Sequence, residues 1–67
     1  MSHLDRVKVE KEELEQKAGA LAVFIYKSEK FKELSYSERN ILKAQLSVMQ
    51  SYISILEIRL ENAKFVA

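Results

Sequence analysis

The 67-residue sequence has no cysteine, no proline and only one glycine. Without cysteine, the chain has neither a disulfide framework nor a thiolate zinc site, and its one histidine, His3, lies beside a terminus. No apolar run approaches the length of a membrane span, and the first residues lack the basic-then-apolar pattern of a signal peptide. We therefore expect a single small cytosolic domain without a metal or other cofactor.

The scarcity of turn-forming residues also predicts the fold class. An all-β or α/β chain would need more glycine and proline than this sequence contains. The net charge is +1, with a mild basic bias between residues 27 and 43. This bias is too slight for a nucleic-acid-binding arm. The sequence predicts an all-helical protein that binds neither DNA nor RNA.

The first long helix is expected from about residue 4 to residue 27. Its apolar residues recur at spacings of three, four and seven, which is typical of a heptad seam. The seam consists of Leu4, Val7, Leu14, Ala18, Leu21 and Ile25. Lys11 takes the one position of the stripe that is not apolar.

A corner is expected over residues 28–35. Ser28 precedes EKFKEL, a candidate for one short helical turn, and Ser35 is followed three residues later by Glu38. The second pair has the spacing of a capping box, in which the serine oxygen accepts the backbone N–H of the glutamate and the carboxylate reaches back. Phe31 and Leu34 are expected to fill the corner.

The second long helix is expected from about residue 36 to residue 64. Seven apolar residues share an arc of roughly 100° on this helix. They are Leu42, Leu46, Met49, Ile53, Leu56, Leu60 and Ala63. The two helices have similar lengths, about 35–45 Å at 1.5 Å per residue. We therefore expect one antiparallel helical hairpin over residues 1–67.

Apolar and small residues also occur outside the stripe that joins the two helices. The second helix has an apolar shoulder at Ile41, Val48, Tyr52 and Ile55, interleaved with Gln45 and Arg59, and a strip of small residues at Ala44, Ser47, Ser51 and Ser54. Two helices along one seam bury too little apolar surface for a chain of this size. We predict a homo-oligomeric helical bundle, a dimer at least, with an interface at Gly19, Ala22, Val23, Val48, Ser51, Tyr52 and Ile55.

No pattern in the sequence indicates catalysis, because phosphate loops and nucleophile elbows are absent and the one histidine, His3, lies beside a terminus. Aromatic and basic residues do gather near the corner, where aromatic rings could stack on nucleobases and cations could meet phosphates. They are Tyr26, Lys30, Phe31, Tyr36, Arg39 and Lys43, with Tyr52 and Arg59 as a second candidate pair. By composition alone, the favoured alternative is that Phe31 is core, Tyr26 is interface and the lysines are solvated.

Residues 21–60 also carry a recognisable spacing. Leu21 and Phe24 are followed by Ser28, Phe31 and Leu34, and then by Leu42, Gln45, Met49, Tyr52, Leu56 and Arg59. This pattern resembles small phage-encoded helical-hairpin proteins, the anti-CBASS cyclic-nucleotide sponges and the hairpin part of related anti-Thoeris sponges. Gln45, Tyr52 and Arg59 are its informative positions, because packing alone would not select Gln or Arg there.

The resemblance implies a non-enzymatic oligomer in the cytoplasm of an infected bacterium. Proteins of this kind bind cyclic di- or trinucleotides, or cyclic ADP-ribose derivatives, at protomer interfaces and hold them without cleavage. An alternative function is a self-assembling structural or adaptor hairpin that binds a protein partner and no small ligand. Nucleic-acid binding is a weaker third hypothesis, and it would be strongly salt-dependent.

Overall fold

The computed structural model describes residues 3–63 as three helices. Helix α1 spans His3–Lys27, α2 spans Glu29–Lys32 and α3 spans Tyr36–Ala63. No strand occurs within this described part, which confirms the all-helical prediction. The expected end of the second long helix at about Lys64 lies outside the described residues.

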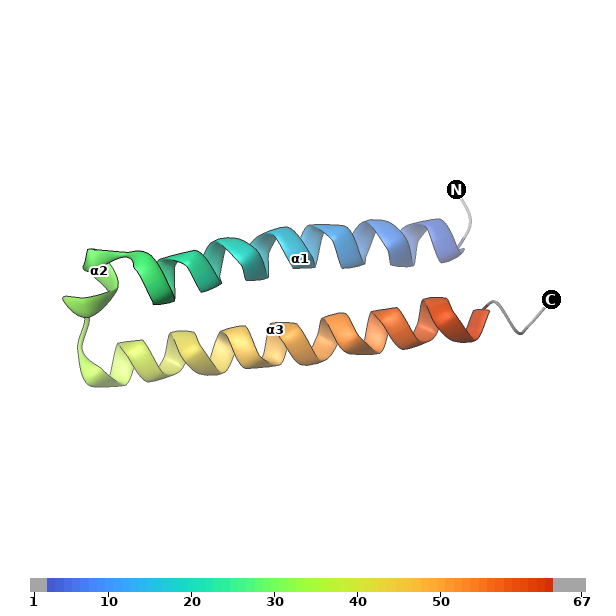
Figure 1. Cartoon of the computed structure of the whole chain (residues 1–67). Coiled ribbons are helices and arrows are strands. Elements are labelled where there is room, and N and C mark those ends of the chain that lie inside the picture. The colour runs from blue at the N-terminus through green and yellow to red at the C-terminus, as the bar shows by residue number, and fades with distance from the viewer. Residues whose placement is uncertain (1–2, 64–67) are drawn as a thin grey trace.

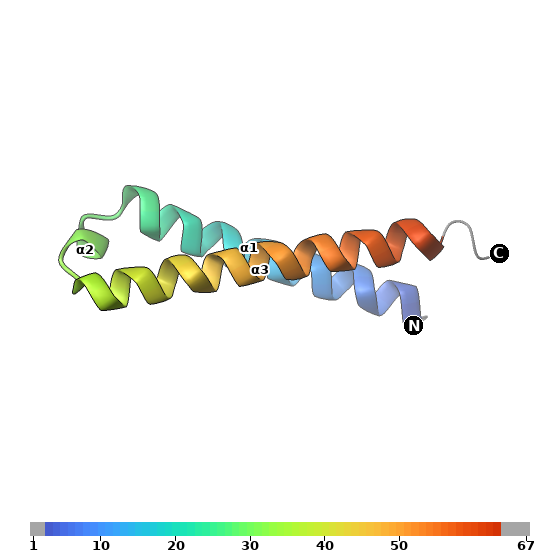
Figure 2. The same ribbon diagram turned by 90° about the horizontal axis from the view of Figure 1, so that it is seen from below.

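The two long helices lie side by side and run in opposite directions, with α2 at the corner between them (Figure 1). They are inclined to one another and cross in the view from below (Figure 2). The principal extents are 51 × 17 × 15 Å, so the molecule is a rod only two helices wide. A rod of this shape has a thin core and much exposed helical surface.

Two serines direct the chain through the corner. The Ser28 hydroxyl accepts the Lys30 backbone N–H at 3.2 Å and so caps α2. The Ser35 hydroxyl accepts the Glu38 backbone N–H at 3.1 Å and donates to the Glu38 carboxylate at 3.2 Å. The bond from the Glu38 backbone N–H to Ser35 confirms the serine half of the predicted capping box, and the Glu38 carboxylate reaches back to the Ser35 hydroxyl instead of the backbone N–H. The described backbone contains no residue with positive φ, which explains how the chain reverses without a glycine.

The core is thin. The buried apolar residues of the described chain are Val7, Ala18, Ile25, Phe31, Leu46 and Leu56. At the corner, Phe31 packs edge-to-face on Phe24, with ring centroids 5.9 Å apart and planes at 84°. Phe31 belongs to the core cluster and Leu34 packs against it, which confirms that they fill the corner. The seam predicted on α1 is wrong at Leu4, which is 43% exposed at the open end of the rod.

The stripe predicted on α3 faces α1. All seven of its residues, from Leu42 to Ala63, are buried or half-buried. The opposite side of α3 has no partner within residues 3–63. Its exposed aliphatic residues, Ile41, Val48, Ile55 and Ile58, are 50–68% exposed.

Candidate functional site

The predicted ligand-contacting residues fall into two groups at different places on the rod. Five of them lie at the corner end and are called here the corner patch: Tyr26, Lys30, Tyr36, Arg39 and Lys43. Tyr52 and Arg59 lie farther along α3. The thirteen residues from Arg39 to Tyr52 correspond to about 20 Å of helix. Even from Lys43, the member of the corner patch nearest to Tyr52, nine residues or about 13 Å of helix separate the two groups.

Phe31 is not part of the exposed surface. Its side chain is only 7% exposed, and it belongs to the core cluster with Ile25 and Leu46. The ring supports the corner from inside, where no ligand could stack on it without unpacking the fold. This placement agrees with the alternative interpretation of Phe31 as a core residue.

The corner patch presents two open aromatic rings. Tyr26, in the last turn of α1, is 76% exposed, and Tyr36, the first residue of α3, is 75% exposed. Arg39 and Lys43 follow Tyr36 at three and seven residues, so the three side chains share one face of the first turns of α3. This arrangement places an aromatic surface beside two cations.

Arg39 has an unsatisfied hydrogen-bond donor. The residue is half-buried, and its Nε–H is shielded from solvent without a hydrogen-bond partner among the residues that the structure describes. Such a donor costs stability, because its interaction with water is lost and not replaced. An arginine that turned this N–H toward a bound anion would gain the acceptor it lacks on the free chain.

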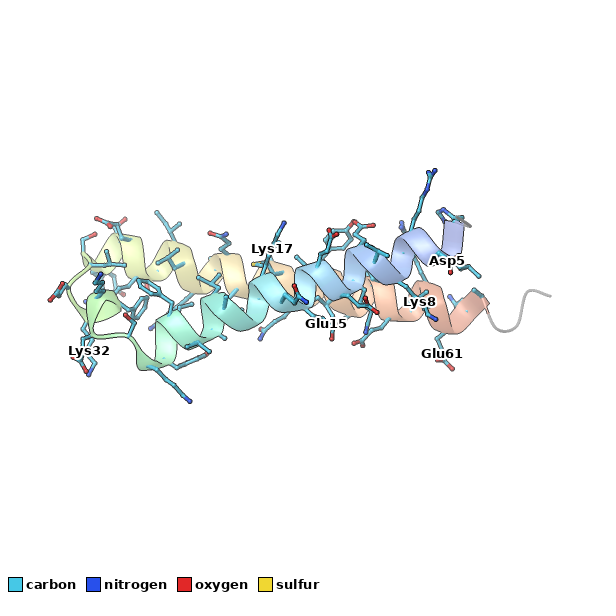
Figure 3. The ribbon with its side chains drawn as sticks, turned by 90° about the horizontal axis from the view of Figure 1, so that it is seen from above. Asp5, Lys8, Glu15, Lys17, Lys32 and Glu61 are labelled. Atoms are coloured by element: carbon cyan, nitrogen blue, oxygen red, sulfur yellow. The ribbon has the colours of Figure 1, made fainter. Side chains whose placement is uncertain are left out.

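The cations of the corner patch form no ion pair with any carboxylate of residues 3–63. In α2, Lys32 pairs with Glu29 at 3.5 Å, whereas Lys30, Arg39 and Lys43 make no ion pair within residues 3–63. Figure 3 shows Lys32 at the corner, Lys17 along the middle of α1, and Asp5, Lys8 and Glu61 at the opposite end. The corner therefore offers positive charge that no neighbouring acidic group in the described chain neutralises by direct contact.

The second group is held by a contact between the two long helices. The Tyr52 hydroxyl donates to the Glu10 carboxylate, forty-two residues away in the sequence. Tyr52 is among the residues predicted from the sequence, whereas Glu10 is not. A hairpin that reverses near residue 31 places residue 10 opposite residue 52, so the approximate register of the two helices makes Glu10 one candidate partner of Tyr52.

The pKa of Tyr52 is raised above its usual value of 10.0, mainly by the hydrogen bond to Glu10. Desolvation and the negative charge of Glu10 also raise this pKa, whereas the positive charge of Arg59 lowers it. The folded chain therefore binds this proton more tightly than the unfolded chain. The resulting stabilisation is fully present below pH 10.0 and is lost as the pH rises through the raised pKa.

This predicts a measurable shift in a spectrophotometric titration. In a Tyr26→Phe/Tyr36→Phe background, Tyr52 is the one remaining tyrosine, and phenolate absorbance reports its ionisation alone. We expect a midpoint above 10.0 that falls toward this value when Glu10→Gln is added, because the nearby negative charge is gone. Equal midpoints with and without the substitution would contradict the contact.

Lys11 joins the helices on the other flank of the buried stripe. Its Nζ lies 3.1 Å from Glu15 on α1 and 3.9 Å from Glu57 on α3. The hydrogen bond to Glu15 is the main cause of a raised pKa for Lys11, opposed by desolvation and assisted by the other nearby carboxylates. The non-apolar position predicted in the seam is therefore a polar link between the helices.

Except for Ala22, which packs against the core cluster, the predicted interface residues lie outside the stripe that joins α1 to α3. Gly19, Val23, Val48, Ser51, Tyr52 and Ile55 are exposed, and Ala22 is half-buried. At Gly19, no neighbouring side chain or separate backbone segment lies within 4 Å of the place a Cβ would take. No contact within the described part of the hairpin therefore requires glycine there. Ile58, 58% exposed, was missed because it lies among small residues.

Residues 3–63 contain neither a cluster of metal-binding side chains nor a helix that could span a membrane. No group of three or more histidine, cysteine, aspartate or glutamate side chains gathers there as a metal site would require. Neither long helix combines the length and hydropathy needed to span a bilayer.

Comparison with known proteins identifies one family. The model of the Sequestin family matches residues 1–62, which include α1, α2 and all but the last residue of α3. No curated protein and no solved structure matched the chain. The match fits the resemblance to phage proteins of the sequestering, sponge type. Because it covers far more than half of the sequence, the chain belongs to the Sequestin family.

Proposed function

We propose that the chain sequesters cyclic nucleotide signals of bacterial immunity, without cleaving them, at sites formed between copies of the hairpin. The signals are cyclic di- or trinucleotides or cyclic ADP-ribose derivatives, in the cytoplasm of a phage-infected bacterium. The observation that carries this proposal is the corner patch of a Sequestin-family chain. There, exposed tyrosine rings stand beside cations that pair with no carboxylate of residues 3–63.

The chemistry of the corner patch matches that of a nucleotide. Tyr36 offers a ring for stacking on a base, which is worth about 1–3 kcal/mol per base. Arg39 and Lys43, on the same face, offer charge-assisted hydrogen bonds to phosphate oxygens. The Tyr52 group suits an anion less well, because its phenol is already bound to the carboxylate of Glu10. We therefore assign the ligand contacts to the corner patch.

Assembly of copies is supported by the exposed aliphatic side chains of α3. Fully burying a valine or isoleucine is worth about 1.5–3 kcal/mol, so side chains as exposed as Val48 and Ile55 would each contribute about 1–2 kcal/mol at an interface. The combined contribution of four such residues from each of two copies is comparable with the roughly 4–15 kcal/mol that association costs. An interface that also encloses the ligand would exclude water from its phosphates.

A thermal-shift panel tests the proposed function. We expect a cyclic dinucleotide, a cyclic trinucleotide or a cyclic ADP-ribose derivative to raise the melting temperature at micromolar concentration, because a ligand that binds only the folded chain stabilises it. The bound nucleotide should be recovered intact after heat denaturation, as checked by mass spectrometry. The matched control is the linear form of the same nucleotide.

A different outcome would favour the adaptor hypothesis. If no nucleotide changed the melting temperature and the chain bound one defined host or phage protein, the ligand contacts assigned to the corner patch would be wrong. Hydrolysis of the nucleotide during incubation would exclude sequestration without cleavage.

Gly19 provides a separate prediction about assembly. In a helix interior, glycine is about 1 kcal/mol less favourable than alanine, and Gly19 has open space around it in the hairpin. We expect Gly19→Ala to retain or increase helicity by circular dichroism but to weaken self-association in sedimentation equilibrium, because the added methyl group would meet a second copy. Unchanged association would remove Gly19 from the interface.

A further inference from the structure

A second heptad pattern runs along the face of α3 that points away from α1. Ile41, Val48 and Ile55 are seven residues apart, and Ala44, Ser51 and Ile58 follow each of them by three. These six residues are called here the outer seam. All six are exposed, and they occupy the spacing of the two core positions of a coiled coil. The inner stripe of α3 already packs on α1, so the outer seam is the face that no other segment of the described residues covers.

We propose that α3 pairs through the outer seam with α3 of a second copy, antiparallel, about a two-fold axis beside Val48 and Ser51. This inference rests on the assembly of copies in the proposed function and specifies which face meets which. The occupant is a second copy because the seam is complementary to itself in both size and charge.

The size pattern selects the antiparallel direction. In this arrangement Ala44 faces Ile55 of the second copy and Val48 faces its Ser51, so a small residue meets a larger one in four of the six layers. The remaining two layers pair Ile41 with Ile58 of the second copy. A parallel pairing would instead stack alanine on alanine and serine on serine, which would leave voids that a well-packed interface avoids.

The charges beside the seam select the same direction. Positions 38, 45, 52 and 59 flank the outer seam on one side. Antiparallel pairing places Glu38 opposite Arg59 of the second copy and Gln45 opposite its Tyr52. Within its own hairpin, Arg59 has no ion-pair partner among the described residues, whereas parallel pairing would place it beside the uncharged Ser54. Two ion pairs across the axis would therefore form only in the antiparallel arrangement.

Cysteine cross-linking tests this arrangement, because the natural chain contains no cysteine. The Ala44→Cys and Ile55→Cys variants are mixed under reducing conditions and then oxidised. We expect a disulfide between the two different variants, identified by its mass, because the two positions face each other. Each variant alone should form little disulfide dimer. In the antiparallel pair, residue 44 would lie about 16 Å along the helix axis from residue 44 of the second copy. The same separation holds for the two residues 55, and it is beyond the reach of a disulfide.

The control is Gln50→Cys, on the opposite side of α3, which should not cross-link with either variant. Efficient cross-linking of Ala44→Cys with itself would show a parallel interface and overturn the proposal. An oligomer that sediments normally but gives no mixed disulfide would also overturn it, while leaving the proposed function intact. A wild-type chain that sediments as a stable monomer in the presence and absence of nucleotide would contradict both.

Discussion

Leu56→Ala is expected to remove most of the stability of the fold. Leu56 is the one large side chain in the described chain that is completely buried, at 0% exposure. Replacing such a leucine with alanine typically costs about 2–5 kcal/mol, through lost burial and the cavity that remains. A domain of this length has a total stability of roughly 3–10 kcal/mol. We therefore expect a large fall in melting temperature, or no cooperative transition, by circular dichroism.

The matched control for this prediction is Val9→Ala on α1. Val9 is 41% exposed, so its truncation should change the free energy of unfolding by no more than about 0.5 kcal/mol. Both variants must be melted at the same chain concentration, because the melting temperature of a self-associating protein depends on concentration. Similar melting of the two variants would contradict the packing of α3 against α1.

The helices and the corner could be predicted because their signals are local. Ser35 and Glu38 are three residues apart, and the hydrogen bonds between them depend only on this spacing. Likewise, the stripe from Leu42 to Ala63 follows from the period of the α-helix. The corner needed no glycine because its caps, and not a left-handed backbone conformation, redirect the chain.

The contacts between helices were harder to predict, because they depend on register. Neither the Tyr52–Glu10 hydrogen bond nor the approach of Lys11 to Glu57 follows from either helix alone. Both require knowing which turn of α1 lies against which turn of α3. The loop length sets this register to within about one turn, which is enough to propose candidate partners but not to choose among them.

Some features of the candidate site likewise follow from local spacing, whereas others depend on packing between the helices. The exposure of Tyr26 and Tyr36 and the grouping of cations at the corner follow from helix spacing and the position of the turn. The burial of Phe31 and the unsatisfied Nε–H of Arg39 depend on how individual side chains pack. A sequence pattern places such residues near one another, but it does not say which of them face inward.

Arg39→Glu is expected to abolish the rise in melting temperature that a cyclic nucleotide causes. The substitution removes the guanidinium and places a negative charge where a phosphate would bind. A hydrogen bond to a charged group is worth about 1.5–3 kcal/mol, so its loss alone corresponds to roughly a 10- to 150-fold weaker affinity. Repulsion between the new carboxylate and the phosphate adds to this loss, so binding at micromolar ligand should no longer be detectable.

The matched control is Lys17→Glu, which makes the same change in net charge. Lys17 lies along the middle of α1, far from the corner, and forms no ion pair within residues 3–63 (Figure 3). If binding depended only on overall charge, both variants would lose it equally, and salt would weaken it to a similar degree. If the corner patch holds the phosphate, Lys17→Glu keeps the ligand-induced shift and Arg39→Glu loses it. Because Arg39 lacks an acceptor for its Nε–H in the free chain, the variant without ligand should fold at least as well as Lys17→Glu.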